Sequence, residues 1–373
     1  MSAKPGYVIR KPLEALPLWE KMAGRRAVFS FDLELTARCN LDCRHCYINL
    51  PAGDRAAKRM ELTAAEVARL GGQAASMGAI WCVLTGGEPL LRRDFEAIYR
   101  ALKKTGLKVS VYTNATLVRP RHVRLFEALP PDDLEVTVYG ATRETYERVT
   151  RTAGSFDAFR RGLDRLLAGG TRVRLKAMAL RSNRHELGRI AEFCRGLTKG
   201  TFRFDPLLHL RLDRDPGRNR DIESERLGPR EIAALERSDA ERFGALLSRC
   251  GELIAPVPPS PECRHLFRCG AGQAGFAVGA DGMFRLCLSL AHPACLYDLR
   301  AGSLVDAWER FVPAVRAMTT DRRDYLEKCG TCPVINLCLW CPAHAYLETG
   351  ELDSPVDAFC RIARARADSL KKG

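Results

Sequence analysis

Three cysteines lie close together near the start of the chain, at a spacing that suits a metal cluster. Cys39, Cys43 and Cys46 follow the pattern C-x3-C-x2-C directly after an apolar run from Val28 to Leu35. Thiolates from one short loop can hold three irons of a four-iron cluster and leave the fourth iron open to a second molecule. Zinc loops and plant-type ferredoxins also use short cysteine runs, so the spacing needs support from the rest of the chain.

That support is a second motif, Gly86-Gly87-Glu88-Pro89, about forty residues further along and directly after an apolar run. The two glycines let the backbone approach a ligand closely, Glu88 can accept a hydrogen bond from an ammonium group, and Pro89 stiffens the turn. Together with the cysteine loop and Tyr47 behind it, this order resembles the radical S-adenosylmethionine (SAM) enzymes over about residues 28–210.

The resemblance implies a [4Fe-4S] cluster on Cys39, Cys43 and Cys46, with SAM on its open iron. Reductive cleavage of SAM would then give a 5′-deoxyadenosyl radical that abstracts hydrogen from a substrate, with a flavodoxin- or ferredoxin-type protein as electron donor. The implied SAM contacts are His45, Gly86, Gly87, Glu88, Pro89, Thr113, Asn114, Thr137 and Lys176. Tyr139 stands where the family often has an acid, and for Lys176 an ordinary ion pair is the alternative interpretation.

A second group of cysteines occupies the C-terminal third of the chain, and its densest part has the pattern C-x2-C-x5-C-x2-C. Such an array of soft thiolates binds iron–sulfur clusters or zinc. Order and spacing resemble the SPASM domain, the auxiliary-cluster extension of radical SAM maturases, although the last interval has two residues where the family usually has three. By that resemblance one auxiliary [4Fe-4S] cluster would use Cys263, Cys269, Cys287 and Cys341, and a second would use Cys329, Cys332, Cys338 and Cys360.

Four cysteines remain outside these sets. Cys82 and Cys194 are predicted to be core residues, because each lies in an apolar pattern. Cys250 is an alternative ligand to Cys263, and Cys295 is a candidate hydrogen donor or substrate-linking thiol.

The elements that must position these residues alternate between apolar strands and amphipathic helices, which predicts an α/β fold. The expected strands are Phe29–Leu35, Ile80–Thr85, Lys108–Thr113, Leu134–Tyr139, Arg172–Leu180 and Thr201–Leu207. Thr63 with Glu66 forms a capping box, and further helices are expected to open at Ser155 and at Asn183. Six strand–helix units predict a partial (β/α)6 TIM-type barrel, in which ligands bind at the carboxyl ends of the strands.

The domain organisation is predicted from composition. Residues 1–26 form an extended lead-in, 27–225 the barrel, 226–262 a helix and a Pro-rich linker, and 263–373 a small cysteine-rich cluster-binding domain. The charged residues 211–230 are expected to form a solvated excursion, and Asp281-Gly282 is expected to form a hairpin turn.

Bulk properties exclude several classes of protein. The formal charge is +14, from 59 Lys and Arg against 45 acids, but the basic residues are interleaved with acids, which argues against a nucleic-acid partner. No window of 18 uncharged apolar residues and no secretory signal are visible, so neither a membrane partner nor export is expected. Fifteen cysteines in such a chain indicate metal chemistry in a reducing, cytoplasmic compartment.

The predicted function is that of a radical SAM maturase, acting on a ribosomally made peptide or protein side chain to form a crosslink, epimerise or oxidise. A separate peptide-recognition protein is an expected partner. The alternative within enzymes is a haem, tetrapyrrole or other cofactor-biosynthesis protein of the same layout, acting on a small molecule. An iron–sulfur electron carrier or zinc-stabilised binding module is the non-catalytic alternative, and the Gly86–Pro89 motif argues against it.

Overall fold

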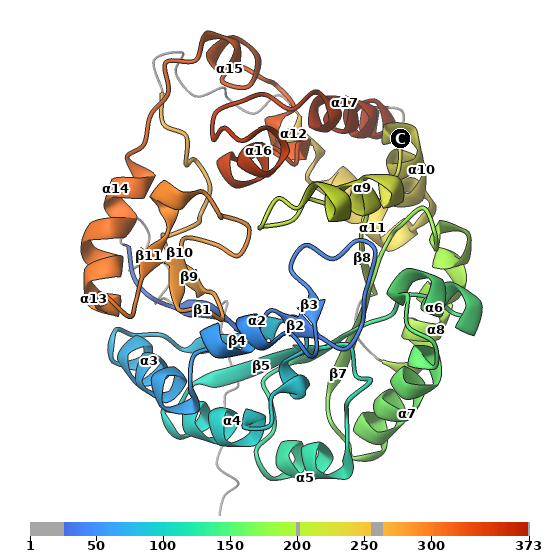
Figure 1. The fold of residues 1–373 in the computed structure, drawn as a ribbon. Helices are drawn as coiled ribbons and strands as arrows, with labels where there is room; N and C mark the ends of the chain where they lie inside the picture. The colour runs from blue at the N-terminus through green and yellow to red at the C-terminus, as the bar shows by residue number, and fades with distance from the viewer. Residues whose placement is uncertain (1–25, 199–201, 255–263, 372–373) are drawn as a thin grey trace, which may run out of the picture.

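The computed structural model describes residues 26–198, 202–254 and 264–371, and its centre is one sheet with the strand order β11-β10-β9-β1-β4-β5-β6-β7-β8 (Figure 1). The six strands of the barrel are β1 Ser30–Thr36, β4 Trp81–Gly86, β5 Lys108–Thr113, β6 Leu134–Thr137, β7 Val173–Met178 and β8 Arg203–Asp205. Each of them pairs parallel with its neighbour. The predicted partial parallel barrel is therefore confirmed.

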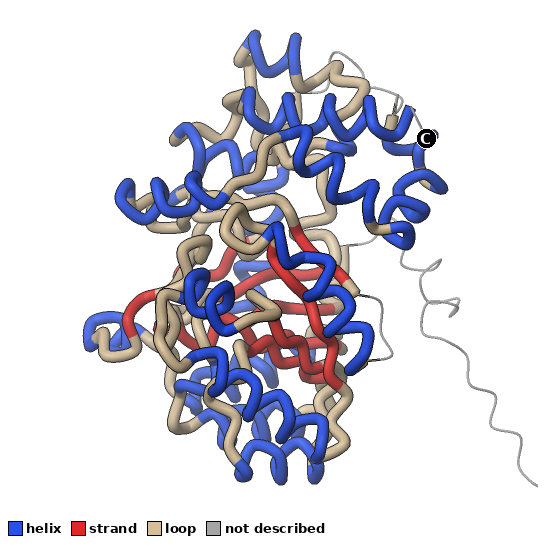
Figure 2. Tube along the Cα trace, turned by 90° about the vertical axis from the view of Figure 1, so that its right-hand side faces the viewer, coloured by secondary structure: helices blue, strands red, loops and turns tan. Residues whose placement is uncertain are grey.

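The helices of this half connect successive strands and lie along the outside of the sheet (Figure 1). They are α3 Ala64–Ser76, α4 Phe95–Lys104, α5 Pro120–Ala128, α6 Arg143–Thr150, α7 Ser155–Ala168 and α8 Leu187–Leu197, with the short α2 Arg55–Met60 before them. The turned view shows the strands in the middle of the molecule with helices around them (Figure 2). This is the arrangement that right-handed strand–helix–strand crossovers produce.

The predicted helix starts are confirmed with one difference. Thr63 and Glu66 form the expected capping box at α3, and α7 begins at Ser155. Asn183 and Glu186 lie at a short 3-10 turn directly before α8, but neither side chain makes a capping hydrogen bond there. Glu186 instead accepts hydrogen bonds from the backbone and hydroxyl of Thr142, so its carboxylate serves the start of α6.

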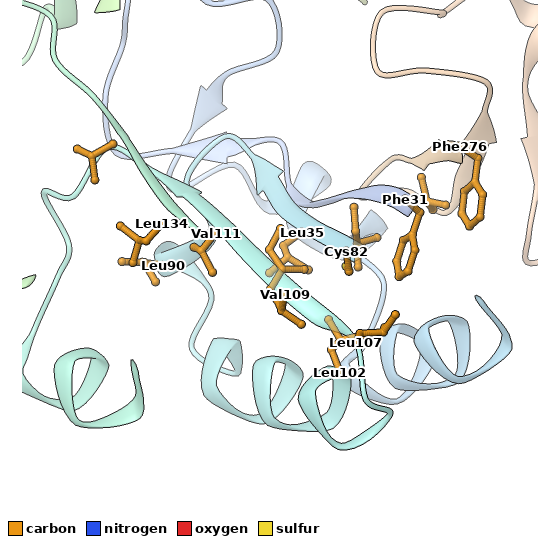
Figure 3. Close-up of a cluster of buried hydrophobic side chains, with 14 of the residues drawn as sticks. Phe31, Leu35, Cys82, Leu90, Leu102, Leu107, Val109, Val111, Leu134 and Phe276 are labelled. Atoms are coloured by element: carbon orange, nitrogen blue, oxygen red, sulfur yellow. The ribbon is translucent and has the colours of Figure 1, made fainter. Parts of the chain in front are cut away.

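The main core fills the space between the strands and the outer helices. Alternate residues of β1, such as Phe31, Leu33 and Leu35, are buried against the helices, as the two-residue period of a strand requires. Figure 3 shows part of this cluster, with Phe31 and Leu35 of β1, Cys82 of β4 and Val109 and Val111 of β5. The residues between them in β1, Asp32 and Glu34, therefore face the inside of the barrel.

The C-terminal region continues the barrel sheet. β9 Gly275–Val278 pairs parallel with β1, and the hairpin partner β10 Met283–Arg285 pairs antiparallel with β9, followed by β11 Tyr297–Asp298. The predicted turn is present, with Gly282 at a φ of 84° that favours glycine. The predicted boundary in the Pro-rich run 256–261 lies outside the described residues, and the division into domains stays a prediction.

The remaining helices lie in the upper part of Figure 1, except α13 and α14, which lie at its left edge beside β10 and β11. They are α9 Pro216–Glu225, α10 Pro229–Ser238, α11 Ala240–Ser248, α12 Cys250–Leu253, α13 Leu304–Asp306, α14 Val312–Arg316, α15 Arg323–Lys328, α16 Pro342–Thr349 and α17 Asp357–Lys371. Within the described ranges, no helix is long and apolar enough to cross a membrane.

A buried ion pair joins the barrel to the C-terminal hairpin. Glu34 of β1 accepts a hydrogen bond from the guanidinium of Arg285 of β10, and the two side chains are 2% and 8% exposed. Burial raises the pKa of Glu34 to about 7, even though Arg285 acts in the opposite direction. The pair is therefore sensitive to the loss of either partner.

We expect Arg285→Met to lower the free energy of unfolding by about 3–5 kcal/mol, because it leaves the Glu34 carboxylate buried without a cation. A folded-state pKa raised above the unfolded value makes the Glu34 contribution fall as pH rises from about 4.5 through about 7. The deficit of the variant should therefore be larger at about pH 8 than at about pH 6. Denaturant unfolding at both pH values measures it.

The matched control is Arg323→Met, which removes an exposed partner of Glu327 and should cost at most about 0.5 kcal/mol. The double variant Glu34→Leu/Arg285→Met should recover much of the loss, because an apolar pair needs no compensating charge. Equal effects of Arg285→Met and Arg323→Met would contradict the importance of the buried pair.

Candidate active site

The three cysteines of the first motif lie on a closed loop at the end of β1. Cys39 ends the short strand β2 Arg38–Cys39, which pairs with β3 Leu50–Pro51 and so closes the loop at its base. Backbone N–H groups of the loop point at sulfur: Leu41 donates to Cys39 Sγ at 3.4 Å, and Asn49 donates to Cys46 Sγ at 3.3 Å. Such donors stabilise negative charge on the sulfur atoms.

The loop forms one wall of a cavity of about 350 Å³ at the carboxyl ends of the strands. Cys39, Cys43 and Cys46 line it. So do the predicted SAM contacts His45, Gly86, Gly87, Thr113, Asn114, Thr137 and Lys176. The structure thus brings two motifs that are separated in sequence, and residues from five strand ends, to one volume within the range of small-ligand sites.

Glu88 does not line this cavity. Its carboxylate is fully buried and accepts hydrogen bonds from the Leu90 amide, the Thr113 hydroxyl and the Asn114 amide at 2.8–3.0 Å. All three donors belong to the chain itself, and the predicted contact of Glu88 with an ammonium group of the ligand stays a prediction. Glu88 therefore holds the strand ends together, and Pro89, also outside the cavity lining, starts the turn Pro89–Leu91.

The glycines of the same motif allow β4 to end very close to the cysteine loop. Gly86 has a φ of 118°, and a Cβ there would lie 2.3 Å from the Thr36 carbonyl oxygen. A Cβ on Gly87 would lie 2.3 Å from the Arg38 carbonyl oxygen. Since backbone atoms cannot yield, only glycine fits at both positions.

His45 and Tyr139 form an aromatic pair beside the cysteines. Their ring centroids are 5.3 Å apart, and both residues line the cavity. Burial lowers the pKa of His45 to about 4, so the imidazole is neutral near pH 7. Its Nδ1 atom is buried without a hydrogen-bond partner among the described residues, and a ligand in the cavity could supply one.

Lys176 already has partners. It pairs with the buried Glu135, and its ammonium group lies 4.7 Å from the ring centroid of Tyr112. The ordinary ion pair considered for this residue is therefore present. Because Lys176 also lines the cavity, a bound carboxylate would share the ammonium group with Glu135.

The donor set fits the cluster that the motif implies. The three thiols lie close enough to raise one another's pKa, and burial, followed by the nearby Glu88, raises the pKa of Cys39 to about 12. Buried thiols that resist ionisation on their own become thiolates when iron neutralises their charge. The Asn114 amide nitrogen adds a long contact of 3.7 Å to Cys39 Sγ.

The C-terminal cysteines influence one another's pKa values. Burial, followed by the nearby thiols of Cys341 and Cys269, raises the pKa of Cys287 to about 11. Burial, followed by the nearby thiols of Cys360, Cys338 and Cys332, raises the pKa of Cys329 to about 12. Backbone amides of His344 and Trp340 donate to Cys341 Sγ and Cys338 Sγ at 3.4 Å. Cys263 lies outside the described residues, so the first predicted ligand set has three described members.

Most cysteines outside the predicted ligand sets occupy buried positions in the hydrophobic core. Cys82 and Cys194 lie in the main core as predicted. Cys295 is also fully buried and contacts the sulfur of Met318 at 3.9 Å, away from the cavity lining. This position does not suit a hydrogen donor or a substrate-linking thiol in that cavity.

The sequence analysis missed two groups of residues. The first lies in residues 211–230, where a solvated excursion was predicted: residues 213–217 are exposed, but other residues of the segment are buried. Arg211 is 2% exposed and donates to the Cys46 carbonyl, while Ile222 and Glu225 of α9 are also buried. The charge-rich sequence did not indicate this burial, because the residues that contact the segment are distant in the chain.

The second missed group also lines the cavity and consists of Asp205, Leu207, Leu208, His209 and Leu288. His209 connects the two cysteine regions. Its ring lies 4.9 Å from that of Tyr47 and 5.0 Å from that of His344, which follows Cys341. The strand end at Asp205 was the only sequence signal for this group.

Comparison with known proteins identifies the family of this site. Residues 33–194, which include both motifs, match the radical SAM superfamily. The chain carries a radical SAM domain. It is therefore a radical SAM enzyme, whose cofactors are a [4Fe-4S] cluster and SAM.

Relatives extend the match beyond the radical SAM domain. An AdoMet-dependent heme synthase of Methanosarcina barkeri is 25% identical over 343 residues, covering 85% of this chain and 92% of the relative. A probable GTP 3′,8-cyclase of Methanocella arvoryzae is 37% identical over 175 residues, but covers only 46% of this chain and 55% of the relative.

The fold of nearly the whole chain is also shared. Streptococcus suis SuiB, in its structure bound to the precursor peptide SuiA, has a TM-score of 0.68 at 15% identity and covers 92% of this chain and 78% of SuiB. The fold prediction is confirmed, whereas the residue roles assigned above stay predictions.

We expect His45→Phe to keep SAM affinity within about threefold, because a neutral buried ring acts by packing. His45→Ala should weaken SAM binding by about tenfold or more, as loss of an aromatic contact costs about 1–3 kcal/mol. Anaerobic calorimetry on the cluster-loaded protein measures both. Similar losses in the two variants would instead assign a polar contact to His45 Nδ1.

Proposed function

We propose that this enzyme reductively cleaves SAM at a cluster on Cys39, Cys43 and Cys46, and abstracts hydrogen from a substrate in the adjoining cavity. The observation that supports it is the convergence of three thiols, the Gly86–Gly87 backbone and Lys176 on one cavity. When bound, the cluster and SAM supply the hydrogen-abstracting radical. The chain orients SAM between the loop and the strand ends and excludes water from the enclosed side.

The substrate we propose first is a ribosomally made peptide or protein side chain. SuiB, which shares the fold, has been solved with its precursor peptide, and this supports a peptide substrate. A second cavity of about 230 Å³ shares Leu207 and Leu208 with the first, and it would offer further space for a substrate larger than the first cavity. A separate recognition protein and a flavodoxin- or ferredoxin-type donor remain part of this proposal.

The second candidate is a haem-type tetrapyrrole or another cofactor precursor. Its support is the heme synthase of Methanosarcina barkeri, which matches over most of both chains and at higher identity than SuiB. The second cavity has Arg181, Arg226 and Arg361 among mainly apolar residues, which would also suit an apolar molecule with carboxylates. Both candidates share the same radical chemistry.

We further propose two auxiliary [4Fe-4S] clusters, with the ligand groups that the sequence analysis assigned. The electrostatic contacts within Cys269, Cys287 and Cys341, and within Cys329, Cys332, Cys338 and Cys360, support this grouping. Cys263 would complete the first set.

The function is tested by 5′-deoxyadenosine formation. The anaerobically reconstituted full chain, with dithionite and SAM, should release it, and Cys43→Ala should reduce release below detection because the cluster loses a ligand. Cys194→Ala, a core cysteine on α8, is the matched control and should retain activity. A Cys43→Ala protein that still cleaves SAM would refute the loop assignment.

The substrate class is tested in the same assay. A peptide library that samples every side chain and a haem-type tetrapyrrole are added separately, and acceleration of 5′-deoxyadenosine release is measured. Acceleration by peptides alone supports the maturase, and acceleration by the tetrapyrrole alone supports the second candidate.

Auxiliary clusters are tested by iron content. Three clusters correspond to about twelve irons per chain, and Cys338→Ala should lose about four of them. Substrate-free cleavage of SAM should persist, since the first loop is intact. An unchanged iron content would remove Cys338 from the ligand set, and zinc in place of iron would refute the auxiliary clusters.

A further inference from the structure

The segment after β8 makes several hydrogen bonds to the cysteine loop. The amide of Leu212 donates to the Tyr47 carbonyl at 3.1 Å. The guanidinium of Arg211 uses Nη1 to contact the Cys46 carbonyl at 3.4 Å and the carbonyl and side-chain oxygens of Asn49 at 3.2 and 3.1 Å. A buried cation is thus fixed directly behind one predicted cluster ligand.

The same contacts hold a donor to sulfur in place. Asn49, whose two oxygens bind Arg211, donates its backbone N–H to Cys46 Sγ at 3.3 Å. Removal of the guanidinium would therefore act on Cys46 in two ways, through charge and through the N–H···S contact. The guanidinium and the N–H···S contact both stabilise extra negative charge on the cluster, so their loss would disfavour the reduced form.

The counter-ion of Arg211 lies in a different environment. Nε and Nη2 donate to Asp213 at 2.8 and 2.6 Å, but the Asp213 side chain is 50% exposed, whereas that of Arg211 is 3% exposed. Water screens the field of the carboxylate more strongly than the field of the buried guanidinium.

We propose that Arg211 is a positioning residue that raises the reduction potential of the [4Fe-4S] cluster on Cys39, Cys43 and Cys46. The step concerned is the transfer of one electron from the external donor to the oxidised cluster, with no proton involved. The reduced cluster carries one more negative charge, so a fixed cation stabilises it more than the oxidised form. This inference rests on the proposed function, because it requires the cluster on this loop.

Arg218 provides an internal comparison. It donates to Asp42 Oδ1 at 2.6 Å and to Asn49 Oδ1 at 2.9 Å, so it also binds the cysteine loop. Its side chain is 26% exposed and is paired with Asp42. Screening by water and by that carboxylate predicts a weaker influence on the cluster than that of Arg211.

The test is a redox titration of the anaerobically reconstituted full chain, followed by electron paramagnetic resonance. The site cluster is recognised as the signal that changes when SAM is added. Arg211→Met should shift its midpoint potential to lower values, and Asp213→Asn should shift it to higher values. Arg211→Lys, which keeps the charge, should remain closer to the wild type than Arg211→Met.

Two further variants provide comparisons for the size of the shift in midpoint potential. Arg218→Met should shift the potential in the same direction as Arg211→Met but by less. Arg100→Met, on the outer helix α4 and paired with Glu96 of the same helix, should leave it unchanged. Asp213→Asn leaves the Arg211 contacts with the loop intact, so it remains decisive if Arg211→Met fails to load the cluster.

Unchanged potentials in Arg211→Met and Asp213→Asn, at full iron loading and with a SAM-responsive signal, would overturn the inference. Shifts of both variants in the same direction would also overturn it, because a disturbed fold rather than a charge would explain them. A wild-type signal that does not respond to SAM would instead contradict the proposed function. The proposed role of Arg211 would then be refuted as well, because it requires that cluster.

Discussion

The buried carboxylate of Glu88 is the constraint on which the site depends. It accepts hydrogen bonds from Leu90, Thr113 and Asn114, and so fixes the turn after β4 to the end of β5. A buried carboxylate without such donors would be costly, so the arrangement of these strand ends is strongly specified. Asn114 then contacts Cys39 Sγ and the Asn40 side chain, which places the cysteine loop against the same unit.

The glycines complete this unit from the other side. The Gly87 amide donates to the Thr36 carbonyl and the Glu88 amide to the Arg38 carbonyl, at 2.6 and 3.0 Å. The end of β1, the end of β4 and the base of the loop are therefore joined by backbone contacts that tolerate no side chain. Behind the loop, Arg211 closes the arrangement from a segment that is distant in sequence. Buried polar contacts thus hold the cysteine loop and the ends of β1, β4 and β5 in their places around the cavity.

The C-terminal cysteines are placed relative to this cavity by the sheet itself. β9 adds to the free edge of β1, and the Glu34–Arg285 pair connects β1 to β10 inside the barrel. His209, which lines the cavity, contacts the rings of Tyr47 and His344. The proposed auxiliary clusters would thus be held by a framework continuous with the radical SAM domain.

The sequence predicts what depends on local patterns. The predicted strand Lys108–Thr113 begins and ends at the same residues in the structure, and the capping box at Thr63 and the hairpin at Gly282 are also present. These features could be predicted because periodicity and turn chemistry depend on residues close together in the sequence. The pairing of β9 with β1 and the burial of Arg211 could not be predicted, since each depends on contacts between segments more than 150 residues apart. The hydrogen bonds that Glu88 accepts from Thr113 and Asn114 could not be predicted either, because these donors lie on another strand. A sequence motif identifies a carboxylate, but it does not show which donors of the folded chain will form hydrogen bonds with it.

The central claim is that Cys39, Cys43 and Cys46 hold a cluster that binds SAM. The most direct measurement is the electron paramagnetic resonance spectrum of the reduced, cluster-loaded protein, recorded before and after addition of SAM. The account predicts that part of the signal changes with SAM, and that this change disappears in Cys43→Ala while the signal of the C-terminal clusters remains. A fully loaded wild-type protein whose spectrum is the same with and without SAM would contradict it.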